Sequence, residues 1–287
     1  MGAGMFALMF AMGLTLGMDD FRRIARSPRA TAVGTSLQLI VMPIVGITLS
    51  NILGLSPLLS TGLIVVSACP GGLFSNMYVH FARGNTALSI TLTATATLVT
   101  LFTLPLWVQF ALTSFSPEGA SDVEMPILDT AVRLSTLTIL PVILGMIAHV
   151  KAPRLARLER RITLPSALLI AFAAMSQAAD RPDIPVETFF EAFYAASYFA
   201  AAAIVLGLTL PALFGLPARD TVTIAVELIV KNTLLGIVLV GQVMDFEALI
   251  PIFAFAVFQT PGGIAILVGW RFMKQRGYFG APASEVP

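Results

Sequence analysis

Residues 67–76 read SACPGGLFSN, and they interrupt an apolar stretch that is otherwise long enough to cross a membrane as one helix. Pro70 removes a backbone hydrogen-bond donor, and Gly71 and Gly72 each lower the stability of a helix. In hydrocarbon, an open backbone is tolerated only where it lines a cavity or is buried in protein. The motif therefore predicts a broken membrane helix with freed carbonyl groups; the simpler alternative is a kink that serves packing.

The composition of the whole chain indicates an integral membrane protein. Of its 287 residues, 57% are hydrophobic and only 11% are charged, whereas soluble domains carry roughly a quarter charged residues. The net charge is +1, so nothing points to a nucleic-acid partner. The single cysteine, Cys69, excludes an intrachain disulfide. The sequence contains no HExxH or Walker motif, and we expect no enzymatic activity.

Nine apolar stretches are predicted to be membrane helices, each of which needs about 20 mostly apolar residues. No stretch remains for a separate soluble domain, so residues 1–287 are predicted to form a single all-α polytopic transmembrane domain. The first and sixth stretches are short. The predicted spans are 1–18, 31–54, 58–82, 86–113, 126–149, 163–179, 188–214, 220–243 and 248–270.

The basic residues follow the predicted spans in an alternating pattern. The connections after spans one, three, five and seven, together with the C-terminal tail, hold 14 of the 17 Lys and Arg residues. The positive-inside rule places these segments in the cytoplasm. We therefore predict a multi-pass protein of the plasma (inner) membrane, with its N-terminus outside and its C-terminus cytoplasmic.

Predicted spans two to four and seven to nine form a pair of three-helix units of opposite orientation. In transporters with such inverted repeats, interrupted helices stand in corresponding positions, and ions and substrate bind where they cross. Span eight contains VELIVKN (226–232), in which Glu227 and Lys231 stand four residues apart. Side chains at this spacing are neighbours on a helix, and a charge in the membrane persists when it is paired.

Four motifs together resemble the bile acid:sodium symporter family. They are similar to the family's CPGG-x-x-SN break, its ARGN-x-ALS run, its Gln-x-x-x-Met-Pro stretch and its Glu-x-x-x-Gln-Asn crossing, and here they read CPGGLFSN (69–76), ARGNTALS (82–89), QLIVMP (38–43) and VELIVKN. The resemblance covers nearly the whole chain. Bacterial members typically have ten helices, and the resemblance implies that this chain lacks the first, as animal members do.

The family resemblance implies an inverted-repeat core with two discontinuous crossing helices and a separate panel. The core would comprise about 31–113 and 188–270, and the panel about 1–18 and 126–179. The family usually has glycines around the Glu and Asn of the second break. Here those positions carry larger residues, which disfavour unwinding: Ile229, Val230, Thr233 and Leu234.

The resemblance also implies two sodium sites behind the crossing. Sodium is a hard cation and favours oxygen ligands. Ser89 and Thr93 are four residues apart and share a face of span four, and Glu227 supplies the negative charge. The first sodium site would use Ser75, Asn76, Ser89, Thr93 and Glu227.

The second sodium site departs from the family at position 231. It would use Gln38, Glu227, backbone carbonyls near residues 228–230 and a glutamine that is here Lys231. We hypothesise that the ammonium group of Lys231 replaces the second sodium and neutralises Glu227, which leaves room for one sodium ion. Two alternatives are that the two charges only neutralise each other for folding, and that Lys231 releases a proton when sodium reaches the first site.

The predicted substrate pocket also differs from the family pattern. Leu73 and Phe74 replace small or polar residues after CPGG, and Gln259-Thr260 stands where the family often has His-Asn. Asn232 is kept and is predicted to contact substrate. Helix N-termini at the two breaks would attract a carboxylate.

The sequence thus predicts a secondary transporter that moves a small organic anion with sodium by alternating access within the lipid bilayer. The first alternative is a carrier of the same fold that is sodium-independent or coupled to protons. The second, of a different class, is a membrane receptor that binds an anion without moving it. No oligomer is implied.

Overall fold

The computed structural model describes residues 2–15, 27–115, 127–152 and 184–276, together with positions 162, 165, 166, 169 and 176. Within this part of the chain the elements are helical, apart from one isolated backbone bridge, which confirms the predicted all-α class. The elements are α1 (Gly2–Thr15), α3 (Pro28–Ser36), the π-helical turn η1 (Leu37–Val41), α4 (Met42–Leu53), α5 (Pro57–Ala68), α6 (Leu73–Phe81), α7 (Thr86–Phe115), α8 (Ile127–Lys151), α10 (Val186–Leu213), α11 (Ala218–Ile229), α12 (Thr233–Val243), the 3-10 turn η4 (Phe246–Leu249) and α13 (Ile250–Gln275).

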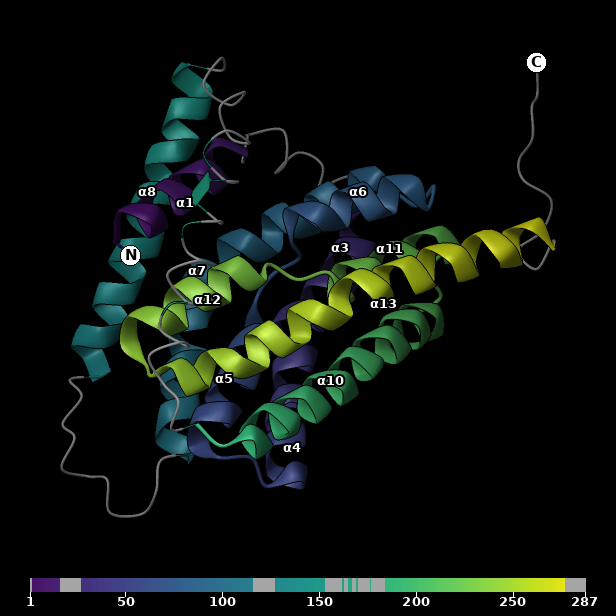
Figure 1. The fold of residues 1–287 in the computed structure, drawn as a ribbon. Helices are drawn as coiled ribbons and strands as arrows, with labels where there is room; N and C mark the ends of the chain where they lie inside the picture. Colours follow the sequence, from purple (N-terminus) through teal and green to yellow (C-terminus); the bar gives the residue numbers. More distant parts are fainter. Residues whose placement is uncertain are drawn as a thin grey trace.

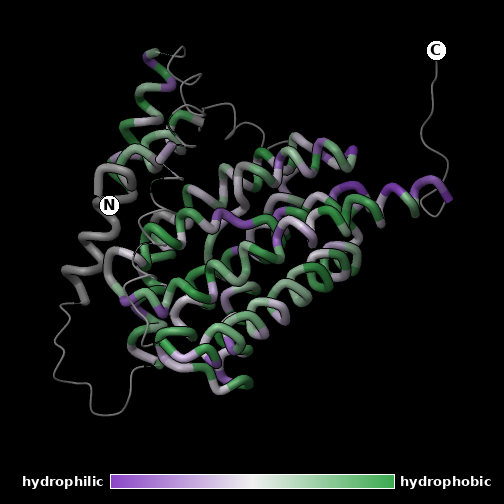
Figure 2. Tube along the Cα trace, viewed as in Figure 1, coloured by the Kyte–Doolittle hydropathy of each residue, from purple (hydrophilic) through white to green (hydrophobic). Residues whose placement is uncertain are grey.

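Three described helical segments are long and apolar enough to cross a membrane unaided: Pro28–Leu53, Val186–Leu213 and Phe246–Gln275. The bent helix α7 is a fourth if its two parts are counted as one span. Figure 2 shows that the tube is mostly apolar and that the last turns of α13 are hydrophilic. These segments support a polytopic membrane protein. Predicted span 163–179 lies outside the described residues except for positions 165, 166, 169 and 176, so the count of nine stays a prediction.

The bend in α7 has an identifiable cause. Its two straight parts, Thr86–Thr100 and Phe102–Phe115, meet at 57°. Pro105 lies inside the helix. Proline has no N–H to donate to the carbonyl four residues earlier, and its ring crowds that carbonyl. The interrupted bond is therefore the one at residue 101, which is where the helix turns.

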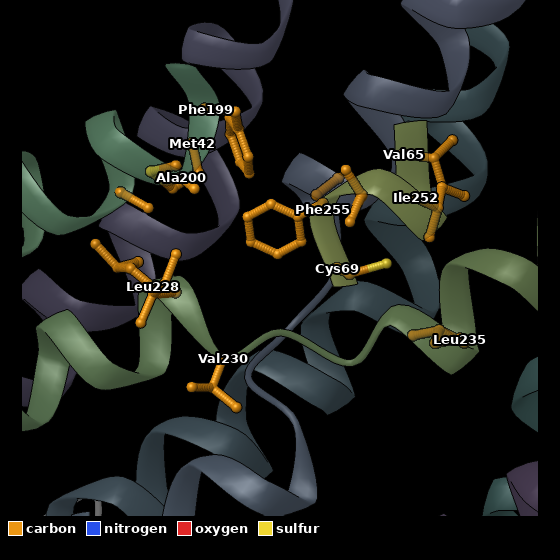
Figure 3. Close-up of a cluster of buried hydrophobic side chains, with 14 of the residues drawn as sticks. Met42, Val65, Cys69, Phe199, Ala200, Leu228, Val230, Leu235, Ile252 and Phe255 are labelled. Carbon is orange, nitrogen blue, oxygen red and sulfur yellow. The ribbon is translucent and has the colours of Figure 1, made fainter. Parts of the chain in front are cut away.

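Two of the predicted spans are each divided into two shorter helices. Residues 69–72 separate α5 from α6, and residues 230–232 separate α11 from α12. Figure 3 shows these two non-helical segments crossing between Cys69, Val230 and Leu235. The first break agrees with the Pro-Gly-Gly prediction. The second forms although the residues around it are not glycines.

The backbone of each break is satisfied by the other break. The Gly72 N–H donates to the Val230 carbonyl at 2.8 Å, and the Asn232 N–H donates to the Pro70 carbonyl at 2.8 Å. These bonds form an isolated antiparallel bridge between Gly71 and Lys231. An interrupted helix in an apolar interior needs such partners, because an unsatisfied backbone group there costs several kcal/mol.

The second break does not need glycine because its backbone angles are ordinary. Val230 has φ −98° and ψ 81°, and Asn232 has φ −78° and ψ 75°. Both φ values are negative, so residues with a Cβ adopt them. The Asn232 side chain then accepts a bond from the Leu235 N–H at 3.2 Å and caps the start of α12.

A buried apolar cluster packs beside the crossing. It draws side chains from α4, α5, α10, α11, α12 and α13, and Figure 3 labels ten of its members. The rings of Phe199 and Phe255 meet edge to face with centroids 5.2 Å apart. Since α10 and α13 lie side by side across the molecule in Figure 1, this cluster closes the crossing off on that side.

Helices α1 and α8 pack chiefly on each other (Figure 1). A Cβ built on Gly13 would overlap the Val142 carbonyl, and one built on Gly145 would overlap the Phe10 carbonyl. Small residues let membrane helices approach this closely. The proposed panel would add span 163–179 to this pair, and the division into core and panel remains a prediction.

Candidate functional site

Glu227 is the centre of a buried oxygen cluster at the crossing. It stands near the end of α11 and is fully buried. Its Oε1 accepts from the hydroxyls of Ser75 at 2.7 Å and Ser89 at 2.5 Å, and its Oε2 accepts from the Thr93 hydroxyl at 3.0 Å. The carboxylate is thus held by three neutral hydroxyls and no basic side chain among the described residues.

Two of these hydroxyls have further oxygen neighbours. The Ser75 Oγ also lies 2.6 Å from the Gly72 carbonyl, and the Ser89 Oγ also lies 2.7 Å from the Asn76 Oδ1. Each hydroxyl carries one proton. Three hydroxyl protons therefore serve five short oxygen contacts, so the cluster has more acceptors than donors when Glu227 is ionised.

The elements bring this cluster together from three parts of the chain. Ser75 and Asn76 stand in the first turn of α6, directly after the first break, and Ser89 and Thr93 stand one turn apart on α7. The structure therefore gathers all five residues of the predicted first sodium site: Ser75, Asn76, Ser89, Thr93 and Glu227. Their role as sodium ligands stays a prediction.

Gly71 leaves room for the Glu227 carboxylate, whereas the sequence alone indicates only that this glycine weakens a helix. A Cβ built on Gly71 would overlap the Glu227 carboxylate. A Cβ on Gly72 would stand 2.9 Å from the Lys231 carbonyl. The two glycines therefore allow the first break to approach the second closely. Neither glycine has a positive φ, so glycine is needed here for space and not for its backbone angles.

Lys231 is held by the carbonyl end of α5. Its Nζ donates to the carbonyls of Ser67 at 2.9 Å and Cys69 at 2.8 Å, and the residue is only 2% exposed. The last carbonyls of a helix have no partner within it and carry a partial negative charge. The ammonium group therefore occupies a position lined by carbonyl oxygens, which are also suitable ligands for a hard metal cation.

The expected i,i+4 pair between Glu227 and Lys231 is not formed. Helix α11 ends at Ile229, so Lys231 lies in the break and no longer stands one turn above Glu227. The described contacts of Glu227 are hydroxyls, and those of Lys231 are carbonyls. The two charges are thus neighbours within one crossing, each with its own set of oxygen partners.

Gln38 braces the first break from the neighbouring segment η1. Its Oε1 accepts from the Gly71 N–H at 3.3 Å, and the side chain is fully buried. The π-helical turn re-aims the helix at this point, as such turns often do at functional sites. The only sequence signal for the turn is Pro43, which cannot bond to the carbonyl of Leu39. Gln38 thus adjoins the break, as the predicted second cation site requires.

The predicted substrate residues are not gathered as closely. Asn232 caps α12, whereas Phe74 on α6 is 64% exposed. The Gln259 Nε2 donates to the Thr233 hydroxyl at 3.3 Å, and Thr260 is exposed on the same helix, α13. The side chain of Leu73 lies outside what the structure describes. Contact of these residues with substrate stays a prediction.

Known proteins resemble this chain over most of its length. "Probable sodium/metabolite cotransporter BASS2, chloroplastic" of Oryza sativa subsp. japonica is 29% identical over 270 residues, which cover 93% of this chain and 63% of the relative. The "Uncharacterized sodium-dependent transporter YocS" of Bacillus subtilis is 25% identical over 281 residues, 97% of this chain and 85% of the relative. The "Ileal sodium/bile acid cotransporter" of Homo sapiens is 26% identical over 292 residues, 98% of this chain and 80% of the relative. This chain spans less than two thirds of the length of the rice relative, so the relative contains sequence that has no counterpart here.

The family assignment follows from a match to a family model. The model described as "Sodium Bile acid symporter family" matches residues 3–181, which is more than half of the chain. The matched residues include both the CPGG break and the Ser89–Thr93 pair. The chain therefore belongs to the sodium bile acid symporter family.

Proposed function

We propose that this protein is a secondary transporter that couples the movement of a small organic anion to one sodium ion. The sodium would bind in the oxygen cluster around Glu227, and the ammonium group of Lys231 would replace a second sodium. The nine spans, the inverted-repeat core and alternating access belong to this proposal. It is supported by similarity to relatives described as a probable sodium/metabolite cotransporter and a sodium/bile acid cotransporter.

The observation that carries the proposal is the excess of acceptors in the cluster. Three hydroxyl protons serve five short oxygen contacts around an ionised Glu227. A cation among these oxygens would let each hydroxyl turn a lone pair toward it and would balance the carboxylate. Oxygen-only ligands and a single charge favour a hard monovalent ion over a transition metal.

Lys231 supports a single sodium for a separate reason. The carbonyls of Ser67 and Cys69 are suitable cation ligands, and they already bind an ammonium group. The Gln38 Oε1, predicted as a further ligand, accepts from the Gly71 N–H instead. A second sodium ion would have to displace the Lys231 ammonium group from the Ser67 and Cys69 carbonyls and the Gly71 N–H from the Gln38 Oε1.

The anion would bind where the two half-helices α6 and α12 begin. Both N-termini follow a break at the crossing, and the free N–H groups and dipole of a helix N-terminus attract carboxylates. Broken helices of transporters use their N-termini for anionic substrates in this way.

The test is uptake by the purified protein in proteoliposomes, with a bile acid and a panel of small carboxylates as probes. We expect uptake of at least one anion to require an inward sodium gradient, with potassium as the control. One sodium with one monovalent anion moves no net charge, so uptake should not respond to membrane potential.

Other outcomes decide between the alternatives. Uptake that is driven by a pH gradient without sodium would replace sodium with a proton as the coupling ion, and Lys231 would then be its carrier. Binding of the anion with no flux under any gradient would contradict transport and favour a receptor.

A further inference from the structure

Five polar side chains along one seam of the molecule have buried atoms without a hydrogen-bond partner among the described residues. They lie on α3, η1, α7 and α11, and they are the hydroxyls of Thr31, Thr35, Thr95 and Thr221 and the amide nitrogen of Gln38. Thr31 and Gln38 are only 3% and 0% exposed. A buried polar group left unsatisfied costs about 1–3 kcal/mol, so this concentration needs a physical reason.

Other threonines of the same helices are satisfied by their own backbone. The hydroxyls of Thr91 on α7 and Thr223 on α11 each donate to the carbonyl four residues earlier, at 2.8 Å. Thr95 and Thr221 stand in the same two helices, and their hydroxyls make no such bond in the structure. The helix geometry offers these hydroxyls a partner that they do not use.

The seam is defined by Gly34, at which three helices meet. A Cβ built on Gly34 would stand 2.6 Å from a terminal methyl of Leu92 on α7 and 3.2 Å from the Ile224 side chain on α11. Thr31, Thr35 and Gln38 are spaced by four and three residues, so they follow one another along one face of α3 and η1 next to Gly34. That face therefore borders α7 and α11.

The three helices run in the same direction along the seam. On α7 and α11, Asn85 bonds to Thr223 at 2.8 Å, and farther along Ser89 and Thr93 bond to Glu227. On α3, Arg29 donates to the Phe214 carbonyl, which precedes α11, and Gly34 comes next to Ile224. Residue numbers thus rise together on all three helices.

This register sorts the unpartnered groups into two levels. Thr31 and Thr221 each precede the Gly34 contact by one turn, and the hydroxyl of Thr95 and the amide of Gln38 each follow it by about one turn. Glu227 also follows Ile224 by one turn, so the second level lies beside the oxygen cluster. Between the levels stand Gly34, with Thr35 directly after it, and the fully buried side chains of Leu92 and Ile224.

The first level lies near the end of the core that carries Arg29, Arg219 and Arg271, which we call the arginine end. All three arginines donate to backbone carbonyls there: those of Phe214, Gly84 and Phe81. Asp220 stands next to Thr221 and accepts from the Asn85 side chain at 2.8 Å. The polar groups therefore continue from this end of the molecule into the seam.

We propose that the seam between α3, α7 and α11 holds bound water and is the route by which the coupling cation moves between the Glu227 cluster and the arginine end. Gly34, Leu92 and Ile224 form the apolar point at which the route is closed in this structure. Unpartnered donors and acceptors at both levels are suited to water, which typically makes about three hydrogen bonds to otherwise unsatisfied groups. This inference rests on the proposed function, because it supplies a path for the proposed ion.

The route is tested by the reaction of introduced cysteines with silver ion, a thiol-reactive monovalent cation. The background is Cys69→Ala, which removes the one native thiol. Single substitutions Thr31→Cys and Thr221→Cys report on the first level, and Thr35→Cys reports on the closed point, because Thr35 directly follows Gly34. Thr100→Cys is the matched control, because Thr100 is buried on α7 with an unpartnered hydroxyl but lies two turns beyond Leu92, outside the seam.

We expect silver ion added on the arginine side of membrane vesicles, in chloride-free buffer, to label Thr31→Cys and Thr221→Cys about tenfold or more faster than Thr100→Cys, a factor that corresponds to about 1.4 kcal/mol. Thr35→Cys should react slowly, and adding Leu92→Ala should accelerate it. Sodium should slow the labelling of Thr35→Cys in the Leu92→Ala background, in which the closed point is opened toward the Glu227 cluster. Labelling of Thr31→Cys and Thr221→Cys at the control rate would overturn the proposal, and so would labelling of Thr35→Cys that Leu92→Ala does not accelerate.

A second measurement covers cysteine variants that fail to fold. The double variant Thr31→Val/Thr221→Val removes both first-level hydroxyls without touching the Glu227 cluster. We expect its uptake rate to fall several-fold while the sodium concentration for half-maximal stabilisation stays unchanged. An unchanged rate would contradict the route. If uptake proves independent of sodium in the parent protein, the proposed function fails instead, and the labelling rates still report whether the seam is wet.

Discussion

The two breaks at the crossing contribute different groups to the site: one contributes backbone carbonyls and glycines, and the other contributes charged side chains. The break at residues 69–72 brings no charged side chain; it offers backbone carbonyls and two glycines that permit close approach. The break at residues 230–232 has no glycine, and its helix and linker bring the two charges, Glu227 and Lys231. Substitutions at residues 69–72 are therefore limited by the space available, and those at Glu227 and Lys231 by the need to stabilise buried charges.

This difference shows why the site depends on both halves of the chain. The carboxylate of Glu227 needs hydroxyls from α6 and α7, and the ammonium of Lys231 needs the carbonyl end of α5. Each charge is stabilised by neutral groups from the other half of the chain. Substitutions in the two breaks should therefore fail in different ways.

The largest effect is expected from Gly71→Ala. Its Cβ would overlap the Glu227 carboxylate, and overpacking of a well-packed interior typically costs about 1–3 kcal/mol. We expect a marked loss of monodisperse protein in size-exclusion chromatography and a lower thermal midpoint. Gly269→Ala is the control, because a Cβ there meets nothing within 4 Å. Equal behaviour of the two variants would refute a steric role for Gly71.

Glu227→Gln should abolish sodium binding while leaving a folded protein. The amide keeps the size of the side chain but removes the charge that would balance the ion. Sodium at about 100 times its dissociation constant stabilises the native state by about 2.7 kcal/mol. We expect this stabilisation in thermal unfolding with sodium against potassium, and its complete loss in the variant.

The control for that change is Asp220→Asn, which removes a carboxylate of the arginine end outside the oxygen cluster. It should retain the stabilisation by sodium. If sodium still stabilises Glu227→Gln as strongly as the parent protein, the ion binds elsewhere and the cluster has another role.

Lys231→Gln should raise the number of sodium ions per anion from one to two. The variant restores an oxygen ligand and frees the Ser67 and Cys69 carbonyls. Each additional charge carried across a potential of about 100 mV is worth about 2.3 kcal/mol. We therefore expect an inside-negative potential to stimulate uptake by the variant and not by the parent protein.

Lys231→Met provides the contrast, because methionine supplies neither an ammonium group nor an oxygen ligand. It should lower stability by about 1–3 kcal/mol, since buried carbonyls lose their partner. Two results would argue against Lys231 as a replacement for sodium. One is uptake by the parent protein that responds to membrane potential, and the other is uptake that responds in neither the parent protein nor Lys231→Gln.

The smallest effect on sodium binding is expected from Val230→Gly in the second break. The added backbone freedom costs roughly 0.5–1 kcal/mol, and loss of the side chain, which is 3% exposed in the apolar cluster, adds about 1.5–3 kcal/mol, so the variant itself should be less stable. Sodium stabilisation should persist, because Val230 contributes only its carbonyl to the bridge. A gain in stability would show that the backbone of this break is strained.

The sequence predicts the first break better than the second for a physical reason. Proline and glycine act locally, so the break at 69–72 can be inferred from three adjacent residues. The break at 230–232 has no such signal, because a non-glycine backbone with negative φ is held there by hydrogen bonds from residues 160 positions away. Only the opposite orientation of the two predicted three-helix units and the family resemblance indicated a crossing at this point.

The partners of the charged residues are predictable to different degrees. Ser75, Ser89 and Thr93 around Glu227 followed from the family pattern. The carbonyl partners of Lys231 did not, because the i,i+4 rule assumes a continuous helix that here ends at Ile229. The levels of unpartnered hydroxyls depend on how three helices pack at Gly34, which composition and spacing do not encode.

The paired hydrogen bonds between Gly72 and Val230 and between Asn232 and Pro70 have a mechanical consequence. They join the ends of four half-helices, α5, α6, α11 and α12, at the crossing. Sliding one break past the other would break both hydrogen bonds in an apolar interior that offers no other donor. We therefore propose that the two breaks move as one unit in the proposed transport cycle. The proposed sliding surface would then lie where no such bond crosses, for example beside the α1–α8 pair.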